Sequence, residues 1–310
     1  MIPRYGCSAA LLWLALMVLS SPSLAQIEDN VLGLSDENLE GYLSPLNTGL
    51  SGTMNSAIFR TGFVPQQRFD LSVGLAVMAV GFGSEDQTYL PTDPDGFTSL
   101  EPTKVPTIIG DPAGMIVEGE SGLSQIYAGG FDLDGFEIAA PQISLGTVMG
   151  TRATLRYMAA DLGDAELGDF SYYGVGAQHS ISQWFDDFPV DLAAGFFFQG
   201  LTIGDGVVDA STLHLNLTAS RQYGIIQPYV GVGYDSSELS VDAEDEDNPE
   251  ESISATLEKQ NNFHLTLGAM ARLSFVGLFF EFNAAAGTGF ALGLDFGTIG
   301  GANYAVDDTM

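Results

Sequence analysis

An alternation of apolar and polar residues with a period of two recurs along most of the chain. In Phe69–Val77 the odd positions are large and apolar, whereas the even positions are polar or small, and Phe263–Ala269 and Leu278–Ala284 repeat the pattern. Successive side chains of a strand point to opposite faces, so this alternation predicts strands with two unlike faces. The runs are about 9–12 residues long, which is the length that a tilted strand needs to cross an outer membrane.

The alternating segments are joined by connections of two kinds. Ten segments lie near 69–80, 140–148, 151–160, 170–181, 190–203, 211–221, 227–237, 262–274, 278–285 and 289–298. The connections after the first, third, fifth and seventh segments are long, and those after the second, fourth, sixth and eighth are short. Long loops at one end and short turns at the other are typical of outer-membrane barrels. We therefore expect an all-β fold, a transmembrane antiparallel up-and-down β-barrel of about 10 strands (range roughly 8–14).

Composition separates a membrane barrel from a soluble β-sandwich or a lipocalin-like barrel. The polar face of the segments contains almost no lysine and much Gly, Ala, Ser and Thr, which suits a crowded interior, whereas a soluble protein would expose Lys and Glu there. The chain carries 40 Asp and Glu against nine Lys and Arg, which argues against a nucleic-acid partner because phosphates require basic contacts. Outer-membrane lipid is the partner that this composition predicts.

The first 25 residues are typical of a Sec signal peptide. Arg4 supplies a positive charge, Ala9–Leu19 is apolar, and Ser23-Leu24-Ala25 is a small-x-small cleavage site. We therefore expect export through a cleaved signal peptide, residues 1–25, to the bacterial outer membrane. Cys7 is the only cysteine, so disulfides and Cys-ligated metals are not expected in the mature chain.

The mature chain divides into an N-terminal segment (26–66), a barrel (67–300) and a C-terminal tail (301–310). Ser35, followed by two acids, is typical of a helix start. Apolar residues then follow at helical spacing, at Leu39, Tyr42, Leu43 and Leu46. Such a segment could plug the barrel from inside or cap its floor from the periplasm, and the sequence leaves both placements open.

Several charged residues and two histidines fall on the face that is predicted to point inward. The lumen-facing candidates are Asp70, Arg152, Arg156, His214, His264, Arg272, Glu281 and Asp295. A network of ion pairs and hydrogen bonds that fills a narrow lumen is the favoured interpretation, since an unpaired charge there would be costly. The other interpretation is a selectivity lining for a pore. Trp184, Phe185 and Phe188 lie at a short turn and are predicted to mark the periplasmic aromatic belt.

No catalytic, cofactor-binding or metal site is predicted, and we expect neither an enzyme nor a cofactor. His214 and His264 share the inward face, so a metal or catalytic pair is conceivable, but no motif marks a neighbouring serine as activated. Acidic turns such as Asp93–Gly96 and the run 242–251 could hold Ca²⁺ through oxygen ligands. Asp-Gly pairs are also ordinary turn formers, and solvated loops are the favoured interpretation.

Four stretches of the sequence resemble a known family. Gly150–Tyr157, Tyr173–Phe185, Phe188–Ala193 and Tyr42–Leu46 together resemble an uncharacterised family of bacterial outer-membrane β-barrel proteins that carry a domain of unknown function and are common in Bacteroidetes-like bacteria. The resemblance covers nearly the whole mature chain and implies fold and location, but no activity. More distantly, a segment ahead of a barrel is similar to the plugged long-chain fatty-acid transporters, although their Asn-Pro-Ala hatch motif has no clear counterpart here.

Three functions remain open at this point. The first is a passive or selective conduit for small or hydrophobic solutes, with residues 27–66 as a plug. The second is a closed structural or surface-interaction barrel that works through its acidic extracellular loops. The third, a barrel enzyme that acts on lipid, has the least support from the sequence.

Overall fold

The computed structural model of the protein describes residues 30–31, 34–67, 69–147, 149–161, 169–204, 206–243, 253–257 and 260–297. The expected signal peptide, the C-terminal tail and most of the acidic run 242–251 lie outside these residues. Within the described ranges, no helix is both long enough and apolar enough to cross a membrane.

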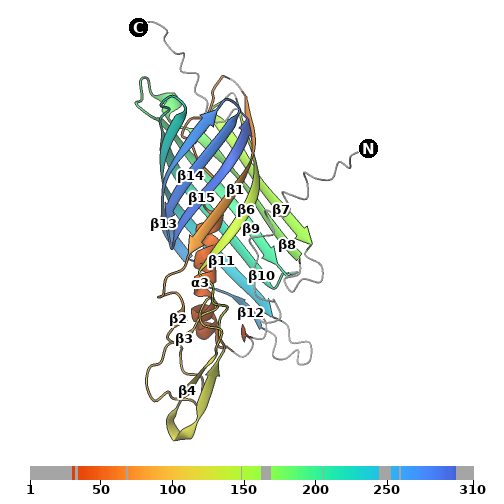
Figure 1. Cartoon of the computed structure of the whole chain (residues 1–310), viewed down its shortest axis with the longest axis vertical. Coiled ribbons are helices and arrows are strands. Elements are labelled where there is room, and N and C mark those ends of the chain that lie inside the picture. Colours follow the sequence, from red (N-terminus) through yellow and green to blue (C-terminus); the bar gives the residue numbers. More distant parts are fainter. Residues whose placement is uncertain are drawn as a thin grey trace.

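Ten long antiparallel strands in the described part of the chain form a closed barrel (Figure 1). They are β1 (Asp70–Gly81), β6 (Gly135–Gly146), β7 (Thr151–Asp161), β8 (Asp169–Ser180), β9 (Asp191–Ile203), β10 (Val208–Ser220), β11 (Ile226–Ala243), β13 (Gln260–Leu273), β14 (Val276–Ala284) and β15 (Thr288–Gly297). Each strand pairs with its neighbours in chain order, and β15 pairs with β1, which closes the sheet. The predicted fold class is confirmed.

Two strands extend at least five residues beyond their predicted bounds. The second begins at Gly135 rather than 140, and the seventh continues beyond 237 to Ala243, where it pairs with the short strand β12 (Ile253–Thr256). In both extensions acidic side chains such as Glu137 and Glu238 point outward and are exposed. In these extensions the outer face is polar and the inner face is apolar, as at Leu239 and Val241, which is the reverse of the pattern on which the prediction rests.

The two ends of the barrel differ. At the end with the longer connections, residues 82–134 form a structure of their own, which lies at the bottom of Figure 1. It contains β2 (Thr88–Tyr89), β3 (Val105–Pro106), β4 (Met115–Glu118), the 3₁₀ helix η1 (Glu120–Gly122) and β5 (Ser124–Tyr127). At the other end the connections are short, and one holds the 3₁₀ helix η2 (Ser182–Trp184). We call these the long-loop end and the short-turn end.

Helix α3 (Asp36–Met54) enters the barrel from the long-loop end, with its N-terminal part beside β2 and its C-terminal part inside the barrel (Figure 1). Ser35 caps its N-terminus by accepting a hydrogen bond from the backbone of Asn38. At the long-loop end, the Asn38 side chain bonds to the backbone of Thr92. At the short-turn end, the carbonyl of Pro65 accepts a hydrogen bond from Gly150 N. Residues 34–67, the lumen segment, therefore run through the barrel from one end to the other.

The interior has two levels. Around α3, in the long-loop half, the core is apolar and includes Leu39, Leu43, Met54, Met78, Leu201 and Leu239, all fully buried. In the short-turn half, the wall presents mostly polar side chains to the rest of the lumen segment. Strand β1 shows the change along a single element, since its inward residues run from Asp70 and Ser72 to Met78 and Val80.

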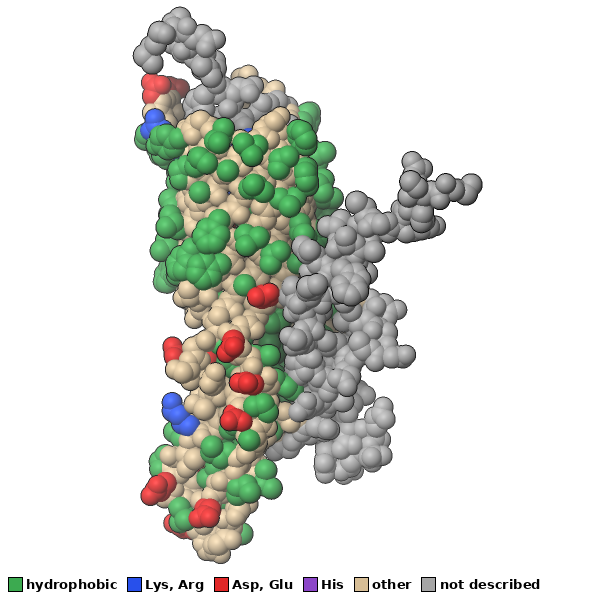
Figure 2. All heavy atoms as spheres, viewed as in Figure 1, with side chains coloured by type: hydrophobic (Ala, Val, Ile, Leu, Met, Phe, Trp, Pro, Cys, Tyr) green, Lys and Arg blue, Asp and Glu red, His purple; other side chains and the backbone are tan. Residues whose placement is uncertain are grey.

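The outer face of the barrel is apolar. Many large side chains on it are about half exposed, among them Leu71, Val73, Leu155, Val175, Phe196, Leu215, Val232, Leu265, Phe280 and Leu292. Figure 2 shows hydrophobic side chains gathered over the upper part of the molecule, whereas most of the Asp and Glu side chains in view lie on the lower part, which holds β2–β5. We call this outward-facing surface the apolar belt.

Candidate functional site: the polar half of the lumen

The structure places the lumen-facing candidates around one stretch of the lumen segment, residues 54–63. Seven of them are buried inside the barrel, namely Asp70, Arg152, Arg156, His214, His264, Glu281 and Asp295. Arg272 is half-buried, and its guanidinium contacts the sulfur of Met270 and the carbonyl of Gly297 rather than a carboxylate.

Arg156 holds the end of the helix. Its Nη1 donates to the carbonyl of Met54 at 3.0 Å, and its Nη2 donates to the carbonyl of Ser56 at 2.8 Å. The last carbonyls of an α-helix have no partner within the helix, and a cation there is also favourable to the helix dipole. Gln142, Gln199 and the hydroxyl of Tyr172 accept the remaining bonds from this fully buried guanidinium. The barrel wall thus caps the C-terminus of α3.

Two ion pairs lie nearer the short-turn end. Arg152 pairs with Asp70 at 2.9 Å and donates to the carbonyl of Phe63 at 3.0 Å. Arg60, from the lumen segment itself, pairs with Asp295, and its guanidinium lies 4.4 Å from the ring centroid of Phe279. Each pair therefore joins the wall to the lumen segment.

Glu281 receives three hydrogen bonds. Its Oε1 accepts from the backbone N–H of Ala57 at 2.8 Å and from Nδ2 of Asn283 at 2.8 Å. Its Oε2 accepts from the hydroxyl of Tyr229 at 2.9 Å. This carboxylate is satisfied by neutral donors, one of which belongs to the lumen segment.

The lumen segment touches the wall most closely at Gly62. Its N–H donates to Oγ of Ser220 at 2.9 Å. A Cβ at this position would lie 2.2 Å from the carbonyl oxygen of Asp191 and 2.8 Å from that of Thr218. Only glycine allows the backbone to approach the wall this closely. The preceding residue, Thr61, places its Oγ1 3.3 Å from Oγ of Ser220.

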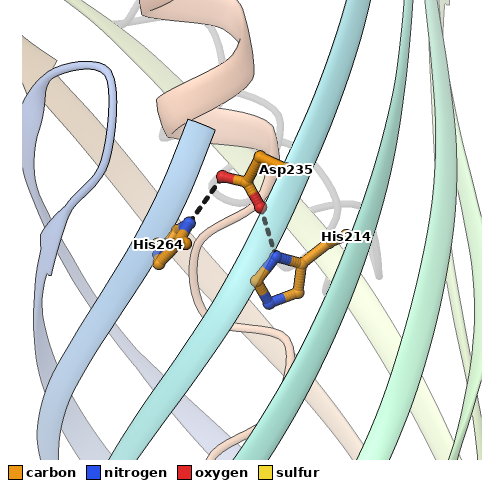
Figure 3. A group of neighbouring side chains, drawn as sticks. All are labelled: His214, Asp235 and His264. Carbon is orange, nitrogen blue, oxygen red and sulfur yellow. Dashed lines mark hydrogen bonds and ion pairs between the residues drawn. The ribbon is translucent and has the colours of Figure 1, made fainter. Parts of the chain in front are cut away.

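His214 and His264 lie on either side of Asp235 (Figure 3). Nδ1 of His214 is 2.5 Å from one oxygen of Asp235, and Nδ1 of His264 is 2.7 Å from the other. All three side chains are buried, and they come from β10, β11 and β13, which are neighbours in the barrel. Two imidazoles and one carboxylate are ligand types that zinc and related metals take in proteins.

The aromatic residues that were predicted for the periplasmic belt lie at the short-turn end. Trp184, Phe185 and Phe188 are 66%, 55% and 42% exposed. They occupy η2 and the turn that follows it, between β8 and β9. The ring of Phe185 contacts that of Phe188, and His179 lies against Trp184 with ring centroids 5.2 Å apart.

The sequence did not indicate Arg60 or Asp235. Arg60 lies in a stretch without periodicity, and no local signal places it beside Asp295. Asp235 could have been found, because the segments 211–221 and 227–237 are joined by a short turn. Pairing them back from the turn sets His214 opposite Asp235, as observed.

Two solved structures that match the chain are distant likenesses. OmpTΔL8, a loop L8 deletion mutant of OmpT described as an outer membrane protein of Vibrio cholerae, has 10% identity and a TM-score of 0.27, with 75% of this chain and 100% of that chain covered. The outer membrane protease OmpT from Escherichia coli has 11% identity and a TM-score of 0.33, with 74% and 96% covered. These likenesses carry no argument about function.

The comparison of sequences bears on the family. No curated protein matches the chain. The model of a family described as a family of unknown function (DUF6588) matches residues 7–298. The predicted resemblance to an uncharacterised family is thereby confirmed, whereas its occurrence in Bacteroidetes-like bacteria and the link to fatty-acid transporters stay predictions. The chain belongs to the family of unknown function DUF6588.

Proposed function

We propose that the protein is an outer-membrane conduit for small polar solutes, and that the lumen segment is the plug that closes it. The observation that carries this proposal is that charged side chains of the barrel wall bind the lumen segment. Arg152, Arg156, Glu281 and Asp295 each bond to the lumen segment. When the segment leaves, these side chains face an aqueous channel, and a polar wall favours polar solutes over hydrophobic ones.

The outer face supports placement in a membrane. The apolar belt is the surface that acyl chains require, and the inward face at the same level is polar, as in barrels that enclose water. The acidic structure of residues 82–134 projects beyond the belt at the long-loop end. In outer-membrane barrels the longer loops are extracellular, so we place this end outside the cell.

The barrel is wide enough for passage once the segment has moved. It encloses the C-terminal part of α3, and an α-helix with its side chains is about 10–12 Å across. The contacts in the polar half are mainly hydrogen bonds to backbone groups of residues 54–63. Apart from the small apolar cluster of Ile58 and Phe59 with Phe197, such contacts can be exchanged for water without exposing apolar surface, so this half of the plug is the part that we expect to open first.

A disulfide between plug and wall tests the proposal. Thr61→Cys with Ser220→Cys joins positions whose hydroxyls lie 3.3 Å apart, and conductance in planar bilayers is recorded for the oxidised and reduced forms. The recordings are repeated in urea at concentrations that leave the barrel folded. The expected result is conductance for the wild type and the reduced form, and none for the oxidised form.

A second disulfide serves as the matched control. Ser144→Cys with Thr154→Cys joins β6 to β7, where the two hydroxyls lie 2.9 Å apart and both belong to the wall. This cross-link leaves the plug free, so its oxidised form is expected to conduct like the wild type. Absence of conductance from the wild type and from every reduced form, with and without urea, would refute the conduit.

One observation favours a second candidate, a closed barrel that works through its surface structure. The hairpin of β4 and β5 packs one face on a small core of Val105, Val117 and Tyr127, and leaves Ile116 and Ile126 65% and 71% exposed. Exposed apolar pairs of this kind are typical of contact surfaces. Aggregation of cells that display the wild type, compared with Ile116→Asp/Ile126→Asp, tests this candidate; equal aggregation argues against it. That the chain is not an enzyme, and that its acidic loops are solvated rather than occupied by Ca²⁺, stay predictions.

A further inference from the structure

The cluster of His214, Asp235 and His264 has the form of a metal site. The three side chains point toward one another from neighbouring strands (Figure 3), and their ligand atoms all lie within 4.8 Å of one another. Since the strands belong to a closed sheet, the three Cα positions are held by the hydrogen bonds of the barrel itself. We propose that these residues bind one divalent transition-metal ion, with Zn²⁺ as the best fit.

Neighbouring side chains hold the two histidine rings in fixed orientations, as is usual for histidines that bind a metal. The outer ring nitrogen of His264, Nε2, lies 2.8 Å from Oδ1 of Asn283, whose amide donates to Glu281. A histidine that binds a metal through one nitrogen usually donates its other N–H to an oxygen acceptor, which fixes the ring. The ring of His214 is stacked on Phe59 of the lumen segment, with centroids 5.8 Å apart. Both rings are therefore fixed with Nδ1 directed at Asp235.

The charge of this part of the lumen also favours a cation. Asp235 and Glu281 are both buried, and among the described residues neither forms an ion pair with a lysine or an arginine. The two histidines are the groups that face Asp235, and Glu281 has only neutral donors. A divalent ion bound by two neutral imidazoles and Asp235 would balance the charges of both carboxylates.

The donor set selects the class of metal. Two imidazole nitrogens suit Zn²⁺, Co²⁺ and related ions, whereas Ca²⁺ and Mg²⁺ require oxygen ligands. A tetrahedral Zn²⁺ with bonds of about 2.0–2.1 Å needs ligand atoms roughly 3.3 Å apart. The present distances from Nδ1 to the carboxylate oxygens are 2.5 and 2.7 Å, and the ligand atoms of all three residues lie within 4.8 Å of one another, so side-chain shifts of about 1–2 Å bring them to that spacing. Binding releases the protons that the two Nδ1 atoms share with Asp235.

The test measures metal bound by the untagged full chain. The protein is folded in detergent with Zn²⁺ or Co²⁺, dialysed, and its metal content is determined by mass spectrometry. We expect one ion per chain. With Co²⁺ we expect the visible absorption bands that are typical of a four-coordinate site. His214→Gln and His264→Gln are each expected to weaken binding by at least about 100-fold. Asn283→Ala, which removes only the acceptor for the outer nitrogen of His264, is expected to weaken it by about 10–100-fold.

The third histidine provides the matched control. His179 lies at the short-turn end, where its ring nitrogens contact Thr151 and Gln183, and His179→Gln is expected to leave metal content and spectrum unchanged. Zn²⁺ should also raise the Tm of the wild type and of His179→Gln, and Mg²⁺ should not. The proposal is overturned if the folded wild type binds no stoichiometric metal and shows no Zn²⁺-dependent Tm, or if His264→Gln retains full binding. None of these measurements depends on whether the plug moves.

Discussion

The guanidinium of Arg156 on β7 lies 2.8 Å from the carbonyl oxygen of Ser56, two residues beyond the end of α3. This contact makes the closed lumen a single structure rather than a barrel with a loose insert. A fully buried arginine without a carboxylate partner depends on neutral acceptors, and two of those acceptors are backbone carbonyls of the lumen segment. The wall and the segment therefore satisfy each other, and removing one leaves the other with unpaired groups.

Arg156→Ala should loosen the lumen segment. The change leaves the carbonyls of Met54 and Ser56 without their donor in a buried site, at a cost of about 3 kcal/mol. Arg156→Lys should lie between wild type and Ala, because an ammonium cannot reach all the acceptors of a guanidinium fork. The measurements are the urea midpoint in detergent micelles and the rate of protease cleavage between residues 34 and 67.

Arg221→Ala is the control for this variant. Arg221 is exposed at the short-turn end, where its guanidinium lies 5.6 Å from the ring centroid of Tyr223. Removal of this charge should change the free energy of unfolding, derived from the urea midpoint, by less than about 0.5 kcal/mol. Equal midpoints for the Arg156 and Arg221 variants would show that the helix end does not depend on Arg156.

Gly62→Ala should push the lumen segment off the wall. The new methyl group would overlap the carbonyl oxygens of Asp191 and Thr218, which belong to strand backbones and cannot rotate away. We expect the free energy of unfolding to fall by about 1–3 kcal/mol, as at other overpacked sites, and the hydrogen bond from Gly62 to Ser220 to be lost. The same urea titration measures the change in stability. Gly81→Ala is the matched glycine, since its nearest atom would be 3.9 Å away, and a drop as large as that of Gly62→Ala would contradict the explanation.

The strands were predictable because alternation reports the two faces of a strand directly. The segments between Phe69 and Phe296 cross the apolar belt, where the outside must be apolar and the inside polar, so each side chain indicates its own direction. Beyond the belt this requirement ends, and for that reason the extension of β11 to Ala243 was missed. The same alternation predicted correctly that the side chains of Arg156 and Glu281 point inward.

The partners of the inward residues were less predictable. The pairings that parity allows include Arg152 with Asp70, and this pair forms. Asp295, however, pairs with Arg60, 235 residues away in the chain. Glu281 has no arginine partner among the described residues. Contacts between the wall and a segment without periodicity depend on the depth to which that segment enters the barrel, and no pattern in the sequence encodes that depth.

Cysteine labelling tests the proposed orientation in the membrane. Ser124→Cys lies at an exposed position of β5 at the long-loop end, and Tyr223→Cys lies at a short turn where the native side chain is 60% exposed. With a maleimide that does not cross membranes, intact cells should label at position 124 only, and permeabilised cells at both. Labelling of position 223 in intact cells would place the short turns outside and reverse the orientation.

Alkaline pH should release the long-loop end of the lumen segment through Tyr42. Burial raises the pKa of Tyr42 to about 12, and its hydroxyl donates to the carbonyl of Gly129 at 2.8 Å. The unfolded chain ionises near pH 10, so the stability that the neutral phenol contributes is complete below about pH 10 and is lost as pH rises toward about 12. Tyr42→Phe should cost about 1 kcal/mol at neutral pH through the lost hydrogen bond, but should flatten the fall in stability between these values.

The measurement is the urea midpoint at a series of pH values from about 8 to about 12. Tyr223→Phe, at an exposed tyrosine, is the control and should follow the wild type at every pH. Because Tyr42 contacts Gly129 in the connection between β1 and β6, hydrogen exchange of that connection should accelerate over the same pH range in the wild type, once corrected for intrinsic exchange. Identical pH profiles for the wild type and Tyr42→Phe would mean that this phenol does not tie the helix to the long-loop end.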